Sequence, residues 1–231
     1  MNEIFVNSVY FGFFFSLLAY GIGVKIQQKT KWSICNPLLI SVILLILLLQ
    51  TAKIDYGVFH AGAQYITYLL TPATVCLALP LYRQLKILKE NLVPLLLGLL
   101  AGCITCMAMI VGFTYLLHLD SILGVSLLPK SITTAIAMGV STEIGGIEGI
   151  TVASVVITGI FSAVVATGVF RIFHIKDPIA QGVALGAAGH AIGTSKALQI
   201  GEIQGAMGSL AIVVTGIMTV ILAPVVANYF F

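Results

Sequence analysis

Charged residues are scarce in this chain. Lys, Arg, Asp and Glu account for 8% of its 231 residues, whereas hydrophobic residues account for 59%. A soluble domain carries about 25% charged residues, so there is too little charge here to cover a surface that faces water. The scarcity excludes an ordinary soluble globular domain, and the mean hydropathy of +1.12 indicates that the solvent is lipid.

The sequence motifs of enzymes are also missing. There is no nucleophile elbow, no paired metal-ligand motif and no glycine-rich phosphate loop after a strand. Lys130 precedes Ser131, but adjacent residues of a helix point in different directions, so a Ser/Lys dyad is not expected. The four cysteines lie in or beside apolar runs, where burial at helix contacts is the ordinary role of a free thiol. We therefore expect no enzyme activity, no metal site and no cofactor.

Six apolar runs are long enough to cross a bilayer, which takes about 20 residues. They cover residues 4–24, 32–52, 56–82, 91–119, 149–170 and 203–231. We predict an all-α polytopic membrane protein with six full transmembrane helices, organised as one integral membrane domain over residues 1–231. Four of these spans fall within residues 1–120. No cleavage site follows the first run, so we expect it to be retained.

Lysines and arginines in the short loops predict the orientation in the membrane. Basic clusters after the first and third runs place those loops in the cytoplasm and the N-terminus outside, with residues 171–177 cytoplasmic and the C-terminus outside. The basic residues flank apolar runs instead of forming a patch, so nucleic-acid binding is not expected. The fourth run then ends outside, and residues 121–148 must return to the side where they begin. This polar stretch predicts a re-entrant hairpin of two half-helices with its tip at residues 129–131, because Pro129 suits the first turn of a helix.

A second polar stretch, residues 179–203, predicts another hairpin that enters from the cytoplasmic side. Glycines recur at helical spacing along it and predict one glycine face that packs closely on a neighbour. These are Gly182, Gly186, Gly189 and Gly193. We expect the helix to stop near Gly193, with Thr194 or Ser195 capping the next half-helix.

Residues 121–175 and 176–231 are predicted to be inverted repeats, each a broken segment followed by one full span. Residues 158–160 and 215–217 both read Thr-Gly-Ile, and residues 143–144 and 202–203 both read Glu-Ile. Inverted repeats whose half-helices meet near the membrane midplane are typical of secondary transporters.

The two predicted tips contain the residue types of an anion site. A half-helix that begins at membrane depth directs free N–H groups and its positive dipole end at one place. Hydroxyls add donors and a lysine adds a full charge, which predicts a bound small carboxylate. Alternatively, the hydroxyls bond their own backbones and the lysines reach an interface. The expected binding residues are Pro129, Lys130, Ser131, Thr133, Thr134, His190, Gly193, Thr194, Ser195 and Lys196.

Four titratable residues accompany the broken segments. Glu143, Glu148 and Glu202 follow them, and His190 lies on the helix that leads to the second tip. Such residues could couple a proton or pair with a lysine. The alternatives are carboxylates at the membrane surface and an interior histidine with satisfied hydrogen bonds.

The run Leu-Pro-Lys-Ser-Ile-Thr-Thr-Ala-Ile-Ala-Met at residues 128–138 is similar to a hallmark of the LrgB/CidB family. So are residues 177–198, which begin Asp-Pro-Ile-Ala, and residues 69–75 with the Pro-Leu-Tyr at 80–82. The resemblance covers essentially the whole chain, with Ala135 standing where proline is common. Family members are described as holin/antiholin-like modulators of murein hydrolase activity and autolysis, beside a small LrgA/CidA-type membrane partner. A related plastidic glycolate/glycerate transporter resembles a fusion of the two partners.

The residues and the resemblance together predict a transporter of small monocarboxylates, such as pyruvate, glycolate or lactate, in the plasma membrane. The resemblance implies the small LrgA/CidA-type protein as its partner. The alternative is a holin/antiholin-like regulator of murein hydrolase activity and autolysis, and the sequence leaves homo-oligomerisation open.

Overall fold

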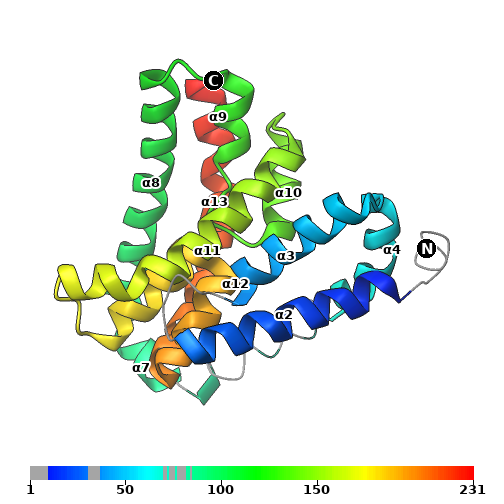
Figure 1. Ribbon diagram of the computed structural model, residues 1–231. Helices are drawn as coiled ribbons and strands as arrows, with labels where there is room; N and C mark the ends of the chain where they lie inside the picture. The colour runs from blue at the N-terminus through cyan, green and yellow to red at the C-terminus, as the bar shows by residue number, and fades with distance from the viewer. Residues whose placement is uncertain (1–9, 31–36, 70–71, 73–75, 77–81, 84) are drawn as a thin grey trace. The chain divides into compact units, whose positions relative to one another are not determined.

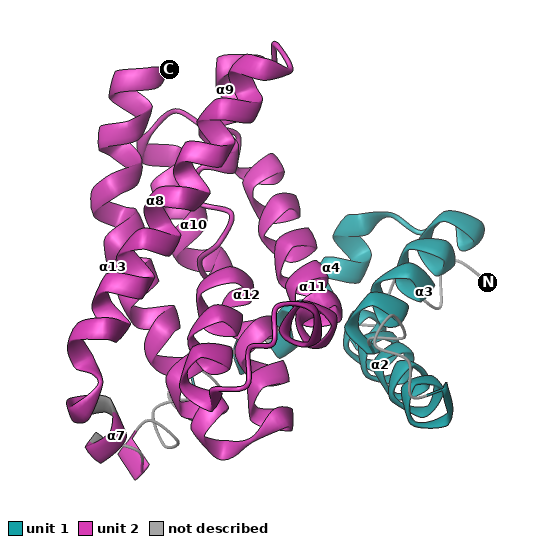
Figure 2. Cartoon of the chain, turned by 90° about the vertical axis from the view of Figure 1, so that its left-hand side faces the viewer, with its two compact units in different colours: residues 1–76 teal, residues 77–231 magenta. Residues whose placement is uncertain are grey.

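The structure, a computed structural model, describes residues 10–30, 37–69, 72, 76, 82–83 and 85–231. Its elements in these ranges are all α-helices, in agreement with the predicted fold class. The chain divides into two compact units, residues 1–76 and 77–231, which are coloured separately in Figure 2. Each unit is described by itself below.

In its described residues the first unit contains the helices α2 (Phe11–Thr30), α3 (Pro37–Ala52) and α4 (Tyr56–Thr67). Helix α2 packs against both α3 and α4. It continues past residue 24, the predicted end of the first span, whereas α3 ends at the predicted end of the second. Much of the predicted third span, residues 56–82, lies outside the described residues.

The other helices of the described residues belong to the second unit (Figure 1). In chain order these are α7 (Leu85–Glu90), α8 (Leu92–Leu116), α9 (Ser121–Leu127), α10 (Thr134–Glu143), α11 (Glu148–Ile172), α12 (Pro178–Ile200) and α13 (Glu202–Phe230). In the described part of the chain, α8, α11 and α13 are long and apolar enough to cross a membrane. They match the predicted spans 91–119, 149–170 and 203–231. The first three predicted spans have no helix that meets this standard in the described ranges, so the count of six stays a prediction.

The same kind of turn connects α3 to α4, α8 to α9 and α11 to α12. In each turn a residue one or two positions after the helix has a positive φ angle, and the next residue donates its N–H back into the last turn, as in a Schellman motif. An aspartate then accepts a backbone N–H of the following helix as its N-cap. The positive-φ residues are Lys53, His118 and His174, and the N-caps are Asp55, Asp120 and Asp177. Such turns reverse the chain within a few residues.

The first polar stretch is broken where the sequence predicts. Helix α9 ends at Leu127 and α10 begins at Thr134, so residues 128–133 are not part of either helix. Pro129 has no N–H, and the Lys130 N–H bonds the Leu127 carbonyl, so neither residue continues the ladder of α9. The break therefore follows from local chemistry.

A buried hydroxyl network brings the two sides of this break together. Thr151 Oγ1 of α11 donates to the Ser126 carbonyl oxygen at 2.8 Å and lies 2.7 Å from Ser141 Oγ. Ser126 Oγ in turn accepts the Ile147 N–H at 2.8 Å. The end of α9, the end of α10 and the start of α11 thus meet at one point. We call residues 121–143 the first hairpin and residues 128–131 its tip.

The second polar stretch is also broken, but not where the sequence predicts. Helix α12 is interrupted at His190, which has φ 41° and ψ −131°. Leu185 and Ala197 pack in one hydrophobic cluster, although 12 residues of unbroken helix would separate them by about 18 Å. The chain therefore reverses at His190, and the expected stop near Gly193 is three residues too late. We call residues 178–189 and 191–200 the two limbs of the second hairpin.

Glycines allow the second hairpin to pack closely, as predicted, although not all on one face. A Cβ atom on Gly182 or Gly186 would overlap the backbone of α13, at the carbonyls of Gln204 and Gly208. Gly193 lies beyond the break, and a Cβ there would overlap the Leu185 carbonyl of the opposite limb. The prediction of a single four-glycine face was wrong because the helix on which it depends ends at His190.

Candidate functional site

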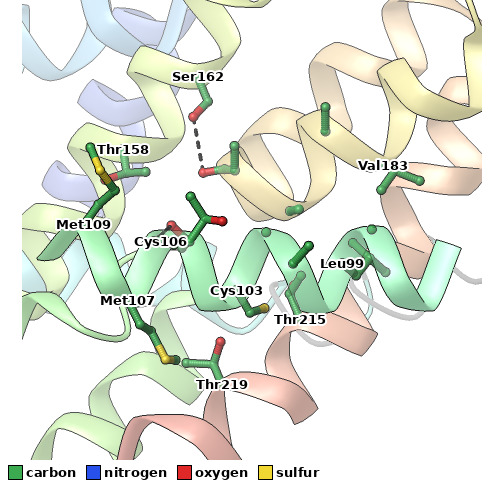
Figure 3. A pocket seen from close by; sticks show the side chains of 18 of the residues that line it. Leu99, Cys103, Cys106, Met107, Met109, Thr158, Ser162, Val183, Thr215 and Thr219 are labelled. Atoms are coloured by element: carbon green, nitrogen blue, oxygen red, sulfur yellow. Dashed lines mark hydrogen bonds between the residues drawn. The ribbon is translucent and has the colours of Figure 1, made fainter. Parts of the chain in front are cut away.

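A cavity of about 1050 Å³ lies within the second unit, and residues of α8, α11, α12 and α13 line it (Figure 3). Its lining follows α8 from Pro94 to Phe113, about 28 Å along the helix axis. That length is comparable to the hydrocarbon core of a bilayer, about 30 Å. The lining is mostly apolar, and its charged members in the described chain are Lys130 and Asp177.

The tip of the first hairpin forms part of the cavity wall. Leu128, Lys130 and Ser131 all line it. The Lys130 ammonium lies 3.4 Å from Ser131 Oγ, which also lies 3.4 Å from Cys106 Sγ of α8. The expectation that the Lys130 and Ser131 side chains diverge was wrong, because these residues are not helical. The contact of Lys130 with Ser131 is long for a hydrogen bond and uses at most one of the three ammonium hydrogens, so the ammonium keeps donors for a ligand.

Hydroxyl groups from two helices that are long and apolar enough to cross a membrane add polarity to the lining. Thr158 and Ser162 come from α11, and Thr215 and Thr219 come from α13. Figure 3 shows Met107 of α8 extending toward Thr219, while Thr158 and Ser162 lie on the other side of α8. Thr215 already bonds its own helix at the Ala211 carbonyl. The cavity is therefore apolar with a few separated polar groups, the usual character of a small-molecule site.

The second hairpin also reaches the cavity, through residues that precede its break. Ala187 and Ala188 line the cavity, and the Ala188 carbonyl accepts a hydrogen bond from Ser162 Oγ at 3.2 Å. None of Gly193, Thr194, Ser195 and Lys196 belongs to the lining as the described residues define it. The structure thus brings parts of both broken segments to one cavity, but the residues of the second segment are not those expected. Binding of an anion between the two predicted tips stays a prediction.

His190 is buried at the reversal of the second hairpin, with 4% of its surface exposed. Its Nε2 lies 3.0 Å from the Val155 carbonyl of α11 and, because a carbonyl only accepts, must carry the hydrogen. The ring lies against Gly159, where a Cβ would come within 2.7 Å of it. A positive φ with this ψ costs a non-glycine residue about 1–3 kcal/mol. These contacts therefore hold His190 in an unfavourable conformation, and its role in proton coupling stays a prediction.

Thr194 has a buried hydroxyl with no hydrogen-bond partner in the described chain. Other helical hydroxyls bond the carbonyl four residues earlier, as Thr114 bonds Ile110 and Ser209 bonds Gly205. The carbonyl four residues before Thr194 belongs to His190, where the helix breaks. Thr194 therefore loses the partner that an unbroken helix supplies.

The remaining predicted binding residues lie around the hairpins. Pro129 is fully buried, and Thr133 and Thr134, at the start of α10, are half-buried. Ser195 is exposed and Lys196 is half-buried. None of these five residues is part of the described cavity lining.

The three predicted carboxylates lie at helix ends and are exposed. Glu143 ends α10, Glu148 begins α11 and Glu202 begins α13. Glu148 accepts a hydrogen bond from the Thr142 hydroxyl at 2.7 Å. None of them lines the cavity in the part of the chain that is described, so the structure favours the alternative of carboxylates near the ends of membrane helices.

Sequence reasoning missed most polar residues of the cavity wall, although one signal was present. Thr158 and Thr215 are the first residues of the two Thr-Gly-Ile motifs that suggested a repeat, and both line the cavity. Cys106, Ser162 and Thr219 have no such signal. No three His, Cys, Asp or Glu side chains gather as a metal site within the described residues.

Comparison with known proteins places the whole chain in one family. The model of the LrgB-like family matches residues 16–229. "Antiholin-like protein LrgB" of Bacillus subtilis (strain 168) is 36% identical over 219 residues, which cover 94% of this chain and 95% of the relative. The protein of the same name from Bacillus mycoides (strain KBAB4) is 35% identical over 216 residues, 93% of this chain and 94% of the relative. No solved structure matches the chain. With the apolar helices described above, this similarity over nearly the full length shows that the chain is a membrane protein of the LrgB-like family.

Proposed function

We propose that this protein carries small monocarboxylates across the plasma membrane, and that Lys130 binds the carboxylate inside the cavity. The observation that carries the proposal is the position of Lys130 in a largely apolar wall, with Ser131 beside it as its polar partner in the described chain. Charged side chains in membrane segments are rare, face cavities and mark substrate paths. A lysine in this position favours an anionic ligand.

The charge of the cavity limits the class of anion. Lys130 is the one cation among its described lining residues, and Asp177 adds a negative charge elsewhere in the wall. A second carboxylate on the ligand would have no basic partner and would have to be desolvated at a cost of several kcal/mol. Monocarboxylates such as pyruvate, lactate and glycolate therefore fit better than dicarboxylates.

The arrangement of the two hairpins supports transport rather than binding alone. Both reach one cavity, and the following spans contribute corresponding threonines, Thr158 from α11 and Thr215 from α13. We propose that residues 121–175 and 176–231 are inverted repeats whose broken segments re-enter the membrane from opposite sides. Relative movement of such repeats opens a central site alternately to the two sides. Asn91 and Asp177, at the predicted cytoplasmic ends of α8 and α12, would then lie at the inner mouth.

A small membrane protein of the LrgA/CidA type is proposed as the partner, on the resemblance described above. The antiholin-like names of the relatives favour a second function, the regulation of murein hydrolase activity and autolysis that the resemblance implies. In our proposal such effects follow from the carboxylate flux. A holin-like pore would instead need self-association and no selective site.

Proteoliposomes distinguish these two functions. Vesicles that contain the purified protein, with and without its partner, should accumulate labelled pyruvate, lactate or glycolate while retaining an entrapped dye such as calcein. The Lys130→Met protein should lose this uptake, and Lys86→Met, which changes an exposed lysine of α7, should retain it. Release of calcein together with uptake that is insensitive to Lys130→Met would favour the pore and exclude the carrier.

A further inference from the structure

The reversal at His190 leaves backbone carbonyl groups at the cavity wall. A helix that ends leaves its last four carbonyls without partners in the helix, and the first limb of α12 ends at this reversal. Ala187 and Ala188 are among its last residues, and both line the cavity. The Ala188 carbonyl accepts from the Ser162 hydroxyl of α11 at 3.2 Å, so a helix C-terminus is directed at a hydroxyl group there.

Two hydroxyls of α11 stand on this side of the cavity. Thr158 and Ser162 are four residues apart, which places them on one face of the helix, and both line the cavity. Figure 3 shows them on the same side of α8, with the dashed bond from Ser162 to a carbonyl of α12. The negative end of a helix dipole attracts cations. Oxygen atoms of carbonyl and hydroxyl groups are the ligands that half-helix ends offer to Na⁺ in transporters.

We propose that the Ala188 carbonyl, with the Ser162 and Thr158 hydroxyls, binds a Na⁺ ion that is carried together with the anion. This inference rests on the proposed carrier function. The three ligands are neutral, which favours a monovalent ion over Ca²⁺ or Mg²⁺, whose sites contain carboxylates. None of the three groups titrates near neutral pH, so a proton cannot take the place of the ion. A Na⁺ ion carried together with a monocarboxylate also cancels the charge of the anion that has to cross the membrane.

Binding measurements on the purified full-length protein test the site. The apparent Kd of labelled lactate is measured in NaCl, KCl and choline chloride at equal ionic strength. Linkage predicts that Na⁺ tightens lactate binding by about fivefold or more relative to choline, and that K⁺ does not. Ser162→Ala and Thr158→Val should each abolish this Na⁺ effect. Ser154→Ala is the matched control, because Ser154 lies on α11, bonds the Thr151 carbonyl and is not part of the described lining.

The thermal midpoint of each variant in choline chloride shows whether the variant is folded, and only folded variants are compared. An Na⁺ effect that is unchanged in both Ser162→Ala and Thr158→Val would overturn the inference, as would equal effects of Na⁺ and K⁺ on the wild-type protein. Lactate binding in choline chloride without any response to Na⁺ would overturn the cation site and leave the carrier function standing. Absence of lactate binding in every salt would instead count against the carrier function itself.

Discussion

Thr151 holds the first hairpin in place, and its replacement by valine should destabilise the protein. Its hydroxyl contacts the Ser126 carbonyl and the Ser141 hydroxyl, and all three residues are fully buried. Valine has nearly the same shape but no hydroxyl. The Ser126 carbonyl then has no donor, because the Lys130 N–H already bonds Leu127.

The loss of unfolding free energy in the Thr151→Val protein follows from two estimates. Hydrogen bonds between helices in membranes contribute about 0.6 kcal/mol each on average, which gives about 1 kcal/mol for two. A buried carbonyl left without a partner costs about 1–3 kcal/mol. We expect Thr151→Val to lower the free energy of unfolding by about 1–3 kcal/mol, or the thermal midpoint by about 2–12 °C for a chain of this size.

The assay is thermal unfolding of the purified protein in detergent, followed by circular dichroism. Thr142→Val is the matched control, because Thr142 is exposed and bonds Met138 and Glu148 on the surface. Its effect should stay within about 0.5 kcal/mol, as for most surface substitutions. Equal thermal midpoints for the Thr151→Val and Thr142→Val proteins would refute the argument that this network closes the hairpin.

The second hairpin and the membrane topology give two further predictions. Gly193→Ala should lower the thermal midpoint, because the added methyl group overlaps the Leu185 carbonyl and such overpacking costs about 1–3 kcal/mol. Gly168→Ala should leave the midpoint unchanged, because a methyl group there meets nothing within 4 Å. Similar midpoints for the two variants would exclude the reversal at His190. Single cysteines at Lys29 and Lys176, in a background without other cysteines, should react with a membrane-impermeant maleimide from the same side. Labelling from opposite sides would show that the first hairpin crosses the membrane fully, because it lies between the two labelled positions.

The first break could be predicted from sequence because its cause is local. The expectation that Pro129 lies in the first turn of the outgoing half-helix was wrong, because α10 begins only at Thr134. Pro129 marks the interruption because it lacks the N–H that a continuous helix needs. The hydroxyl network that closes the hairpin could not be predicted, since Ser126 and Thr151 lie 25 residues apart and meet only in the folded protein. The tip was therefore placed correctly while its support was missed.

The second break was misplaced because its cause is tertiary. Gly193 is the residue that local preference would choose for a reversal, since glycine adopts positive φ at little cost. In the structure His190 makes the turn instead. Its ring bonds the Val155 carbonyl and packs against Gly159, which has no side chain to overlap the ring. Gly193 serves the close approach of the two limbs. A glycine pattern indicates tight contact without saying which residue makes the turn.

The cavity wall was the least predictable part of the site. Thr158, Ser162 and Thr219 lie in long apolar helices, where a hydroxyl normally bonds the preceding turn and indicates nothing further. Their shared position depends on how α8, α11 and α13 pack around the cavity. Lys130 could be found because a charge in a membrane segment is conspicuous in any sequence.

Equilibrium binding of labelled lactate to the purified protein tests the assignment of Lys130 most directly. A charge-assisted contact contributes about 1.5–3 kcal/mol, so Lys130→Met should weaken binding by about tenfold or more. Lys86→Met, at an exposed position in α7, should bind lactate like the wild type. Wild-type affinity in a folded Lys130→Met protein would contradict an anion site in this cavity.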